Sequence, residues 1–206
     1  MARAVFPGYL KLTFGCMTAG KTDYACKTAT LYADLEGLSV LYVNTILDER
    51  ETVGGENSKF TSHSSSNKYL SEKVATARVK CLRDLKDYIS YDVIVIDEGQ
   101  FFPDLIDVVM EMVEGYHKHV EVVGLDGDFQ RRPFGKILEL IPKADDVIKL
   151  NARCGQCVKQ GLSSHDLSSL RKPAPFSKKI SGSDDLIEIG GGEKYIAVCR
   201  YHYLNS

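Results

Sequence analysis

An octapeptide near the N-terminus constrains the fold more than any other part of the sequence. Residues 15–22 read Gly-Cys-Met-Thr-Ala-Gly-Lys-Thr and match the pattern G-x-x-x-x-G-K-[ST] without a mismatch. A β-prone run, 9–14, precedes it, and apolar residues at helical spacing follow over 21–35, which is the setting that makes the motif credible. A chance glycine-rich turn, the alternative, would not need that setting. The pattern therefore predicts a strand, a phosphate-binding loop and a helix in this order.

The chemistry of such a loop indicates a nucleoside triphosphate. Glycines let backbone N–H groups curve around phosphate oxygens, and the start of the helix adds the positive end of its dipole. We expect Lys21 to reach the β- and γ-phosphates of ATP or GTP and the Thr22 hydroxyl to coordinate Mg²⁺. The residues predicted to hold the nucleotide are Gly15, Cys16, Met17, Thr18, Ala19, Gly20, Lys21 and Thr22.

The other apolar runs predict an α/β fold of the P-loop NTPase-like class. Near-continuous apolar segments favour strands buried on both faces, and strands that alternate with helices favour a mainly parallel sheet with flanking helices. A polar stretch rich in Gly, Ser and Asn, 47–67, is expected to be a long surface loop. The expected strands are 9–14, 38–45, 92–97, 120–126 and 147–151, and the expected helices are 21–35, 71–90 and 103–117.

The end of one predicted strand carries a second acidic element. Asp97 and Glu98 close the apolar run 93–96, so they should face the same crevice as the phosphate loop. We expect Asp97 to hold Mg²⁺ together with Thr22, and Glu98 to take a proton from an attacking hydroxyl. A solvated strand end is the alternative reading of Glu98. The pair alone does not separate a kinase from an ATPase, because the same glutamate could activate water.

The C-terminal region has a different texture and its own motif. After Asn151 the sequence becomes rich in Cys, Gly, Ser, Lys and Pro, which predicts one domain over 1–150 and a smaller one over 151–206. A C-x₂-C pair followed by a C-x₂-H pair offers four soft ligands for tetrahedral Zn²⁺, with no open position and hence a structural role. A disulfide or simple core cysteines are the alternatives. The predicted zinc ligands are Cys154, Cys157, Cys199 and His202.

Composition excludes several classes of protein. The formal net charge is −2, without the domain-wide basic excess that a nucleic-acid surface shows, so we expect no nucleic-acid partner. No apolar run approaches the roughly 20 residues of a membrane helix, and the N-terminus lacks an apolar secretion signal. We therefore expect no membrane partner, a cytoplasmic location and reduced thiols.

Three segments together resemble the type II, cellular-type thymidine kinase family over nearly the whole chain. The first two are long and idiosyncratic, and the third resembles the family's substrate-covering lasso loop. They read Asp-Glu-Gly-Gln-Phe-Phe-Pro-Asp at 97–104, Gly-Leu-Asp-Gly-Asp-Phe-Gln-Arg-Arg-Pro-Phe-Gly at 124–135, and Gly-Gly-Gly-Glu-Lys-Tyr at 190–195.

The resemblance implies an activity and assigns residues to it. It implies ATP-dependent phosphorylation of the 5′-hydroxyl of thymidine, and also of deoxyuridine, with Glu98 as general base. It also implies homotetramers, inhibition by dTTP, and a zinc-binding lasso domain anchored by the four metal ligands. Further nucleotide-site residues implied are Asp48, Glu49, Arg50, Asp97, Gly99 and Gln100. Residues implied to surround or cover the nucleoside are Met17, Phe101, Leu125, Phe129, Phe134, Leu186, Ile187, Glu188, Ile189, Gly190 and Tyr195.

The sequence departs from the family pattern in places and leaves two other functions open. Cys16 and Thr18 replace residues more usual in the family's phosphate loop, and the segments 53–60 and 158–185 are expanded. One alternative is a P-loop ATPase whose zinc ribbon binds nucleic acid, which predicts hydrolysis stimulated by DNA or RNA. Another is a catalytically idle nucleotide-binding module, against which the intact set of Lys21, Thr22, Asp97 and Glu98 argues.

Overall fold

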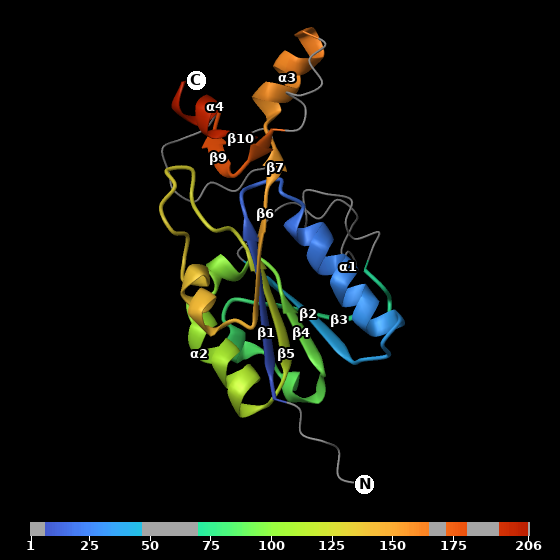
Figure 1. Ribbon diagram of the computed structural model, residues 1–206. Coiled ribbons are helices and arrows are strands. Elements are labelled where there is room, and N and C mark those ends of the chain that lie inside the picture. The colour runs from blue at the N-terminus through green and yellow to red at the C-terminus, as the bar shows by residue number, and fades with distance from the viewer. Residues whose placement is uncertain (1–6, 47–69, 165–171, 181–193, 206) are drawn as a thin grey trace.

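The computed structural model describes residues 7–46, 70–164, 172–180 and 194–205 (Figure 1). Its centre is a six-stranded, wholly parallel sheet with the strand order β3-β2-β4-β5-β1-β6. This architecture confirms the predicted α/β class. The strands are β1 Tyr9–Gly15, β2 Val40–Thr45, β3 Ala75–Val79, β4 Val93–Ile96, β5 His119–Gly124 and β6 Asp146–Leu150.

The central strands are mainly apolar because helices cover both faces of the sheet, although β5 also contains the buried Glu121. In β4, Ile94 and Ile96 pack into the larger hydrophobic core, whereas Val93 and Val95 pack into the core beneath α1 (Lys21–Asp34). All four side chains are fully buried. Burial on both faces removes the polar–apolar alternation of a half-exposed strand, so the continuous run 93–96 is the pattern that this position requires.

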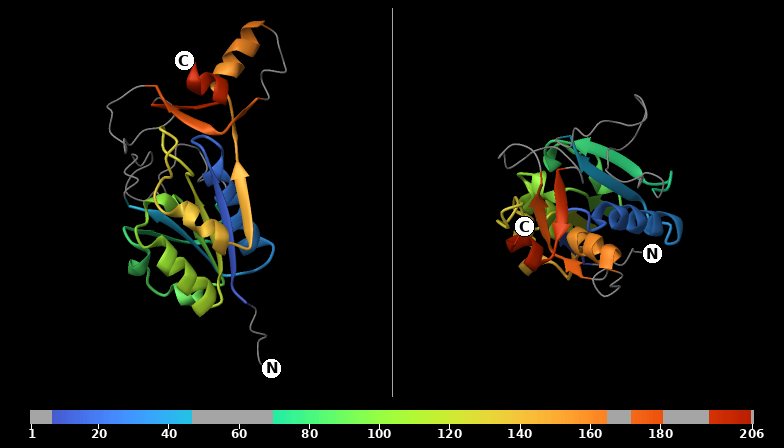
Figure 2. Two further views of the ribbon diagram at one scale, coloured as in Figure 1. Left: turned by 60° about the vertical axis from the view of Figure 1, so that its left-hand side comes forward. Right: turned by 90° about the horizontal axis from the view of Figure 1, so that it is seen from above.

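Helices of different kinds cover the two faces (Figures 1 and 2). One face carries α1, and the other carries α2 (Leu105–Met110), its π-helical continuation Glu111–Gly115 and the 3₁₀ helix Ile137–Lys143. The predicted helices 21–35 and 103–117 are thereby confirmed. The buried side of α1 consists of small residues such as Ala25 and Ala29, while Leu31 is 45% exposed. Small side chains let the helix approach the sheet closely.

The predicted helix 71–90 is wrong. Residues Ala75–Val79 form β3, an edge strand parallel to β2, and two 3₁₀ turns follow at Leu82–Asp84 and Tyr88–Ser90. The first turn is held from outside, because the Asp104 carboxylate accepts the backbone N–H groups of Leu82 and Arg83 over 3.1 and 3.0 Å. A hydrogen bond to a residue 21 or 22 positions away lies beyond any local periodicity.

The described residues after β6 form a compact group at the carboxyl ends of the sheet strands (Figure 2). We call this group, residues 152–164, 172–180 and 194–205, the C-terminal module. It contains two antiparallel pairs, β7 (Ala152–Arg153) with β8 (Pro173–Ala174) and β9 (Phe176–Lys179) with β10 (Tyr195–Val198). Two helices complete it, α3 (Gly155–Ser164) and α4 (Arg200–Leu204).

Across the described part of the chain, no helix has the combined length and apolar character needed to cross a membrane. The predicted surface loop 47–67 lies outside the described residues.

Candidate active site

The phosphate loop joins β1 to α1 at the carboxyl edge of the sheet. Two of its residues have left-handed backbone, Thr18 with φ +59° and Gly20 with φ +79°. Gly20 adopts this conformation without steric cost and directly precedes the first residue of α1. The Nζ of Lys21 donates a hydrogen bond to the Cys16 carbonyl over 2.8 Å, so the loop curves around its own lysine.

The electrostatic setting of Lys21 brings the two predicted motifs together. Burial lowers the pKa of this amine, and the carboxylates of Glu98, Asp97 and Asp126 oppose that shift. These acids follow β4 and β5, whereas the lysine follows β1, and all three strands are parallel neighbours in the sheet. The buried lysine can pair with a phosphate, and the neighbouring carboxylates offer oxygen ligands for the metal ion that accompanies it.

Asp97 is buried and is held by the protein on both carboxylate oxygens. Oδ1 accepts the Glu98 backbone N–H over 2.9 Å, and Oδ2 accepts the Tyr42 hydroxyl over 2.8 Å. The Thr22 hydroxyl also hydrogen-bonds to it, which tends to lower its pKa. Burial, followed by the neighbouring charge of Glu98, dominates and raises the pKa of Asp97 to about 6. A hydroxyl and a carboxylate side by side are the oxygen donors that Mg²⁺ prefers.

Glu98 occupies a backbone conformation that few glutamates adopt, with φ +55° and ψ +39°. Its Oε2 accepts a hydrogen bond from Nε2 of Gln100 over 2.7 Å, and Oε1 of Gln100 accepts the Leu125 backbone N–H over 2.9 Å. Left-handed backbone at a non-glycine residue costs on the order of 1–3 kcal/mol and clusters at functional sites. The fold therefore holds Glu98 in a strained backbone conformation, and Gln100 links its carboxylate to the backbone at Leu125.

Two glycines make room for Gln100. A Cβ at Gly124 would lie 2.3 Å from Oε1 of Gln100, and one at Gly135 would lie 2.1 Å from its backbone carbonyl oxygen. Real Cβ atoms do not approach oxygen atoms that closely. Any other residue at Gly124 would displace the side-chain amide of Gln100, and any other residue at Gly135 would displace its backbone carbonyl. Gly124 and Gly135 begin and end the second idiosyncratic segment of the sequence, and Gln100 belongs to the first. The two segments are thus in direct contact.

The aromatic residues expected near a nucleoside fall into two groups. Phe101 and Phe134 meet edge to face, with ring centroids 5.4 Å apart. Phe129 and Tyr195 form the other group, because Nζ of Lys179 lies 5.3 and 5.8 Å from their ring centroids. The second group joins the loop after β5 to the C-terminal module, so its rings are contributed by distant parts of the chain.

The predicted metal ligands converge in the C-terminal module, with ligand atoms all within 4.8 Å of one another. Nδ1 of His202 lies 3.4–3.5 Å from the three cysteine sulfurs, and Sγ of Cys157 lies 3.8 Å from that of Cys199. A tetrahedron with Zn–S of about 2.3 Å and Zn–N of about 2.0 Å requires separations of roughly 3.5 and 3.8 Å. Burial acts to raise the pKa of the Cys154 thiol, but backbone hydrogen bonds from Cys199 and Cys157 lower it to about 6. Burial and the neighbouring thiols raise the pKa of Cys157, so Cys154 forms the metal-binding thiolate more readily than Cys157.

Comparison with known proteins agrees with this geometry. The family model described as thymidine kinase matches residues 8–203. The chain is 35% identical to the thymidine kinase of Monkeypox virus (strain Zaire-96-I-16) over 203 residues, covering 97% of this chain and 98% of the relative. It is 34% identical to thymidine kinase 1 of Dictyostelium discoideum over 197 residues, covering 95% and 78%. This chain belongs to the thymidine kinase family.

Membership of the thymidine kinase family identifies the chain as a kinase. The described part of the chain does not include every residue implied by the family resemblance. Asp48, Glu49 and Arg50, together with the cover residues 186–190, lie outside the described residues, and their assignment stays a prediction.

Sequence reasoning also missed residues that support this thymidine kinase site. Tyr42 is only 1% exposed and lies between the aliphatic residues Leu41 and Val43 of β2, and a phenol buried in this way needs a hydrogen-bond partner. The sequence could therefore have indicated that Tyr42 has a hydrogen-bond partner, although not that this partner is Asp97. Gln100 was expected near the nucleotide, yet its side chain links Glu98 to Leu125. No sequence pattern indicated the contacts of Ser177 and Tyr203 described below.

Proposed function

We propose that this kinase transfers the γ-phosphoryl group of ATP to the 5′-hydroxyl of thymidine, and of deoxyuridine, to give the 5′-monophosphate. The observation that carries the proposal is the strained Glu98 carboxylate, fixed by Gln100 next to Lys21 and Asp97. Membership of the thymidine kinase family supports the choice of acceptor.

The phosphate loop and Lys21 would bind the triphosphate. Backbone N–H groups at the start of α1 would face the phosphates, and the lysine would exchange its internal bond to the Cys16 carbonyl for phosphate oxygens. Thr22 and Asp97 would hold Mg²⁺, which when bound would offset the negative charge of the phosphates. Arg50, from the predicted Asp-x-Arg segment, is our candidate for further charge compensation.

Glu98 would act as the general base. As the 5′-oxygen forms its bond to the γ-phosphorus, the bond from that phosphorus to the β–γ bridging oxygen breaks and ADP departs. The hydroxyl proton passes to the Glu98 carboxylate. Gln100 orients this carboxylate, so that little reorganisation is needed when the substrates are in place.

The aromatic groups would enclose the nucleoside and exclude water. Phe101 and Phe134 offer an edge-to-face pair beside Gln100, and Phe129 and Tyr195 would close over the substrate with the predicted cover residues 186–190. Exclusion of water favours transfer to a sugar hydroxyl over ATP hydrolysis. Met17 and Leu125 are proposed to contact the base and sugar in the same region.

The remaining parts of the proposal concern assembly and regulation. The four-ligand cluster is proposed to hold a structural zinc ion that anchors the cover segment. On the family resemblance we also propose a cytoplasmic homotetramer that is inhibited by dTTP. Light scattering of the purified protein and a dTTP titration of its activity test these two points directly.

Phosphorylation of a nucleoside panel by purified protein, with ATP hydrolysis followed in parallel, tests the function. Rapid conversion of thymidine and deoxyuridine, with slow hydrolysis in the absence of nucleoside, is expected. ATP hydrolysis without any phosphorylated nucleoside would contradict the proposal. Stimulation of that hydrolysis by DNA or RNA would then favour the ATPase with a nucleic-acid-binding zinc ribbon.

A further inference from the structure

The C-terminal module contacts the phosphate loop directly through two hydrogen bonds. The Cys16 thiol donates a hydrogen bond to the Ala174 carbonyl over 2.9 Å, and the Met17 backbone N–H donates to Oγ of Ser177 over 2.9 Å. The partners are 158 and 160 residues apart in sequence. Two adjacent residues of the loop are therefore tied to two neighbouring strands of the module.

The hydrogen bond between Cys16 and Ala174 is buried, and the one between Met17 and Ser177 is partly buried. Cys16 is 1% exposed, Ala174 is fully buried and Ser177 is 5% exposed. Burial raises the pKa of the Cys16 thiol, so it keeps the proton that it donates. A buried hydrogen bond is costly to lose, because the remaining donor or acceptor cannot hydrogen-bond to water instead. The link between module and loop is thus a packed interface and not a surface encounter.

The same interface contains the metal ligands. Cys16 packs in one buried cluster with Cys154 and Cys157, and Ala19 of the loop packs against it. The Cys154 backbone N–H also donates to the Lys172 carbonyl over 3.1 Å, two residues before Ala174. The metal cluster and the phosphate loop therefore share one small hydrophobic core.

Strand register connects each tie to a metal ligand. Ala174 pairs with Ala152, which lies two residues before the ligand Cys154. Ser177 pairs with Ala197, which lies two residues before the ligand Cys199. A bound metal fixes these ligands relative to one another. Through the two short strand pairings it would also fix Ala174 and Ser177, which hydrogen-bond to Cys16 and Met17.

We propose that the metal-bearing module braces the phosphate loop, with Ser177 as a positioning residue for ATP binding. The loop needs such support because Thr18 and Gly20 have left-handed backbone, which fixes an unusual loop path. A loop held in its binding shape does not have to be ordered when ATP arrives. Loss of the metal then weakens ATP binding itself, in addition to any effect on the nucleoside cover.

The first test compares Ser177→Ala with the matched control Ser90→Ala. The control also removes a serine hydroxyl that makes one hydrogen bond, to the Asp87 carbonyl over 2.7 Å, but in a turn far from the loop in sequence and structure. Affinity for ATP is measured calorimetrically without nucleoside, and thermal unfolding checks that each variant folds. We expect Ser177→Ala to weaken ATP binding by about two- to tenfold, the equivalent of one intramolecular hydrogen bond.

Kinetics provide a readout that general destabilisation would not give. In Ser177→Ala the KM for ATP should rise together with the dissociation constant, while kcat measured with both substrates saturating stays at its wild-type value. Wild-type ATP affinity in a folded Ser177→Ala protein overturns the brace, and so does an equal loss in Ser90→Ala. The kinetic arm rests on the proposed function, whereas the binding arm does not. Weakened ATP binding without nucleoside turnover would therefore reject the function and keep the brace.

A second variant connects the metal to the same effect. Cys157→Ser removes a metal ligand that makes no contact with ATP in the proposed site, and we expect weaker ATP binding in the folded full-length protein. Combined with Ser177→Ala, its effect should be less than additive, because both changes act through one interface. Full additivity would show that the metal does not act through Ser177 and would overturn that route. If Cys157→Ser does not fold, the Ser177→Ala measurement alone decides the proposal.

Discussion

Nε2 of Gln100 donates to Oε2 of Glu98 over 2.7 Å, while Oε1 of the same amide accepts the Leu125 backbone N–H. Because Gln100 is 4% exposed and both ends of its amide are used, it acts as a rigid link between the end of β4 and the end of β5. The position of the proposed base is thus set by a side chain that need not touch either substrate.

Replacement of Gln100 by Leu tests this link. The substitution preserves much of the side-chain volume but removes the donor to Glu98 and leaves the Leu125 N–H without its acceptor. We expect kcat to fall by up to roughly 100-fold, the cost of a misplaced catalytic group. ATP affinity, measured calorimetrically, should stay within about twofold of wild type. An unchanged kcat would show that Glu98 does not need this support.

Asp97 predicts a pH dependence of stability in the magnesium-free protein. Its pKa in the folded protein is raised to about 6 from an ordinary value of 3.8 by burial and then by Glu98. A raised carboxyl pKa means that this group stabilises the fold fully below pH 3.8 and that the contribution is lost as pH rises through 6. The full difference amounts to roughly 3 kcal/mol.

Urea unfolding of the wild type and of Asp97→Asn isolates this contribution, because the other titrating groups are common to both proteins. Between pH 4 and 8 the wild type should lose stability relative to the variant by up to roughly 3 kcal/mol. A difference that does not change with pH would contradict the raised pKa.

The metal cluster predicts one zinc ion per chain. Because four protein ligands close the coordination sphere, Cys157→Ser should lose most of the bound zinc and lower the thermal midpoint. His202→Cys is the matched control, since four cysteines also form a structural zinc site. Elemental analysis of the purified proteins measures the zinc content. Full zinc content in Cys157→Ser would show that this cysteine is not a ligand.

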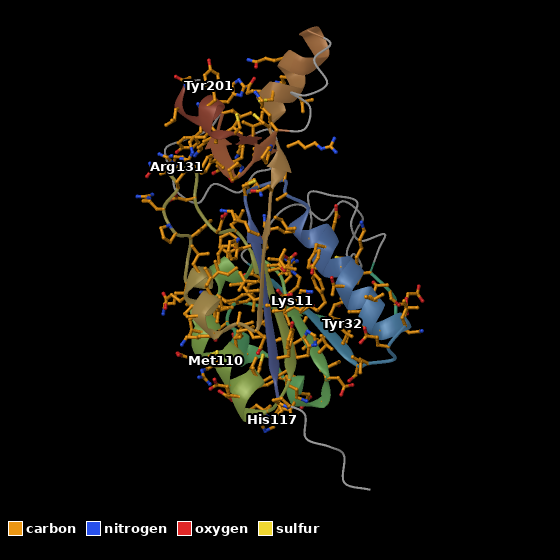
Figure 3. The ribbon with its side chains drawn as sticks, viewed as in Figure 1. Lys11, Tyr32, Met110, His117, Arg131 and Tyr201 are labelled. Atoms are coloured by element: carbon orange, nitrogen blue, oxygen red, sulfur yellow. The ribbon has the colours of Figure 1, made fainter. Side chains whose placement is uncertain are left out.

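A second contact of the C-terminal module should act on the nucleoside. The Tyr203 hydroxyl donates to the Phe129 carbonyl over 2.7 Å, and the guanidinium of Arg131 lies 4.3 Å from the centroid of the Tyr203 ring. Figure 3 shows Arg131 directly beside the module. The tyrosine thus anchors the loop that presents Phe129.

We expect Tyr203→Phe to raise the KM for thymidine by about two- to tenfold, as for the loss of one hydrogen bond, and to leave the KM for ATP unchanged. Tyr201→Phe is the control, because Tyr201 is 66% exposed and points away from the loop (Figure 3). Steady-state kinetics with each substrate varied in turn measure both constants. Equal effects in the two variants would show that the hydrogen bond from Tyr203 to the Phe129 carbonyl does not support thymidine binding.

Sequence patterns predicted those parts of the molecule whose causes are local. The strand containing Val95 was predictable because burial on both faces demands a continuous apolar run. The strands containing Leu12 and Val122 were predictable because apolar residues predominate in them. β3 was not, since Ala75–Val79 is short and its strand identity comes from pairing with β2. Motif spacing placed Lys21, Asp97 and Glu98 at one edge of the sheet.

The support around these motifs depends on long-range contacts and was not predictable. The left-handed backbone of Glu98 and the hydrogen bond from Tyr42 to Asp97 have no signature in the sequence. The tie between Met17 and Ser177 spans 160 residues, and strands as short as β8 and β9 have no periodicity to read. Such contacts become visible only when the chain is folded.

The central claim is that Glu98 removes the proton from the 5′-hydroxyl of thymidine. Its most direct test is a single-turnover experiment in which enzyme in excess over γ-labelled ATP is mixed with thymidine, using the wild type and Glu98→Gln. We expect label in thymidine monophosphate with the wild type, and a rate lower by about 10²–10⁴-fold with the variant. ATP affinity should be nearly unchanged in that variant. Wild-type transfer by Glu98→Gln would contradict the account.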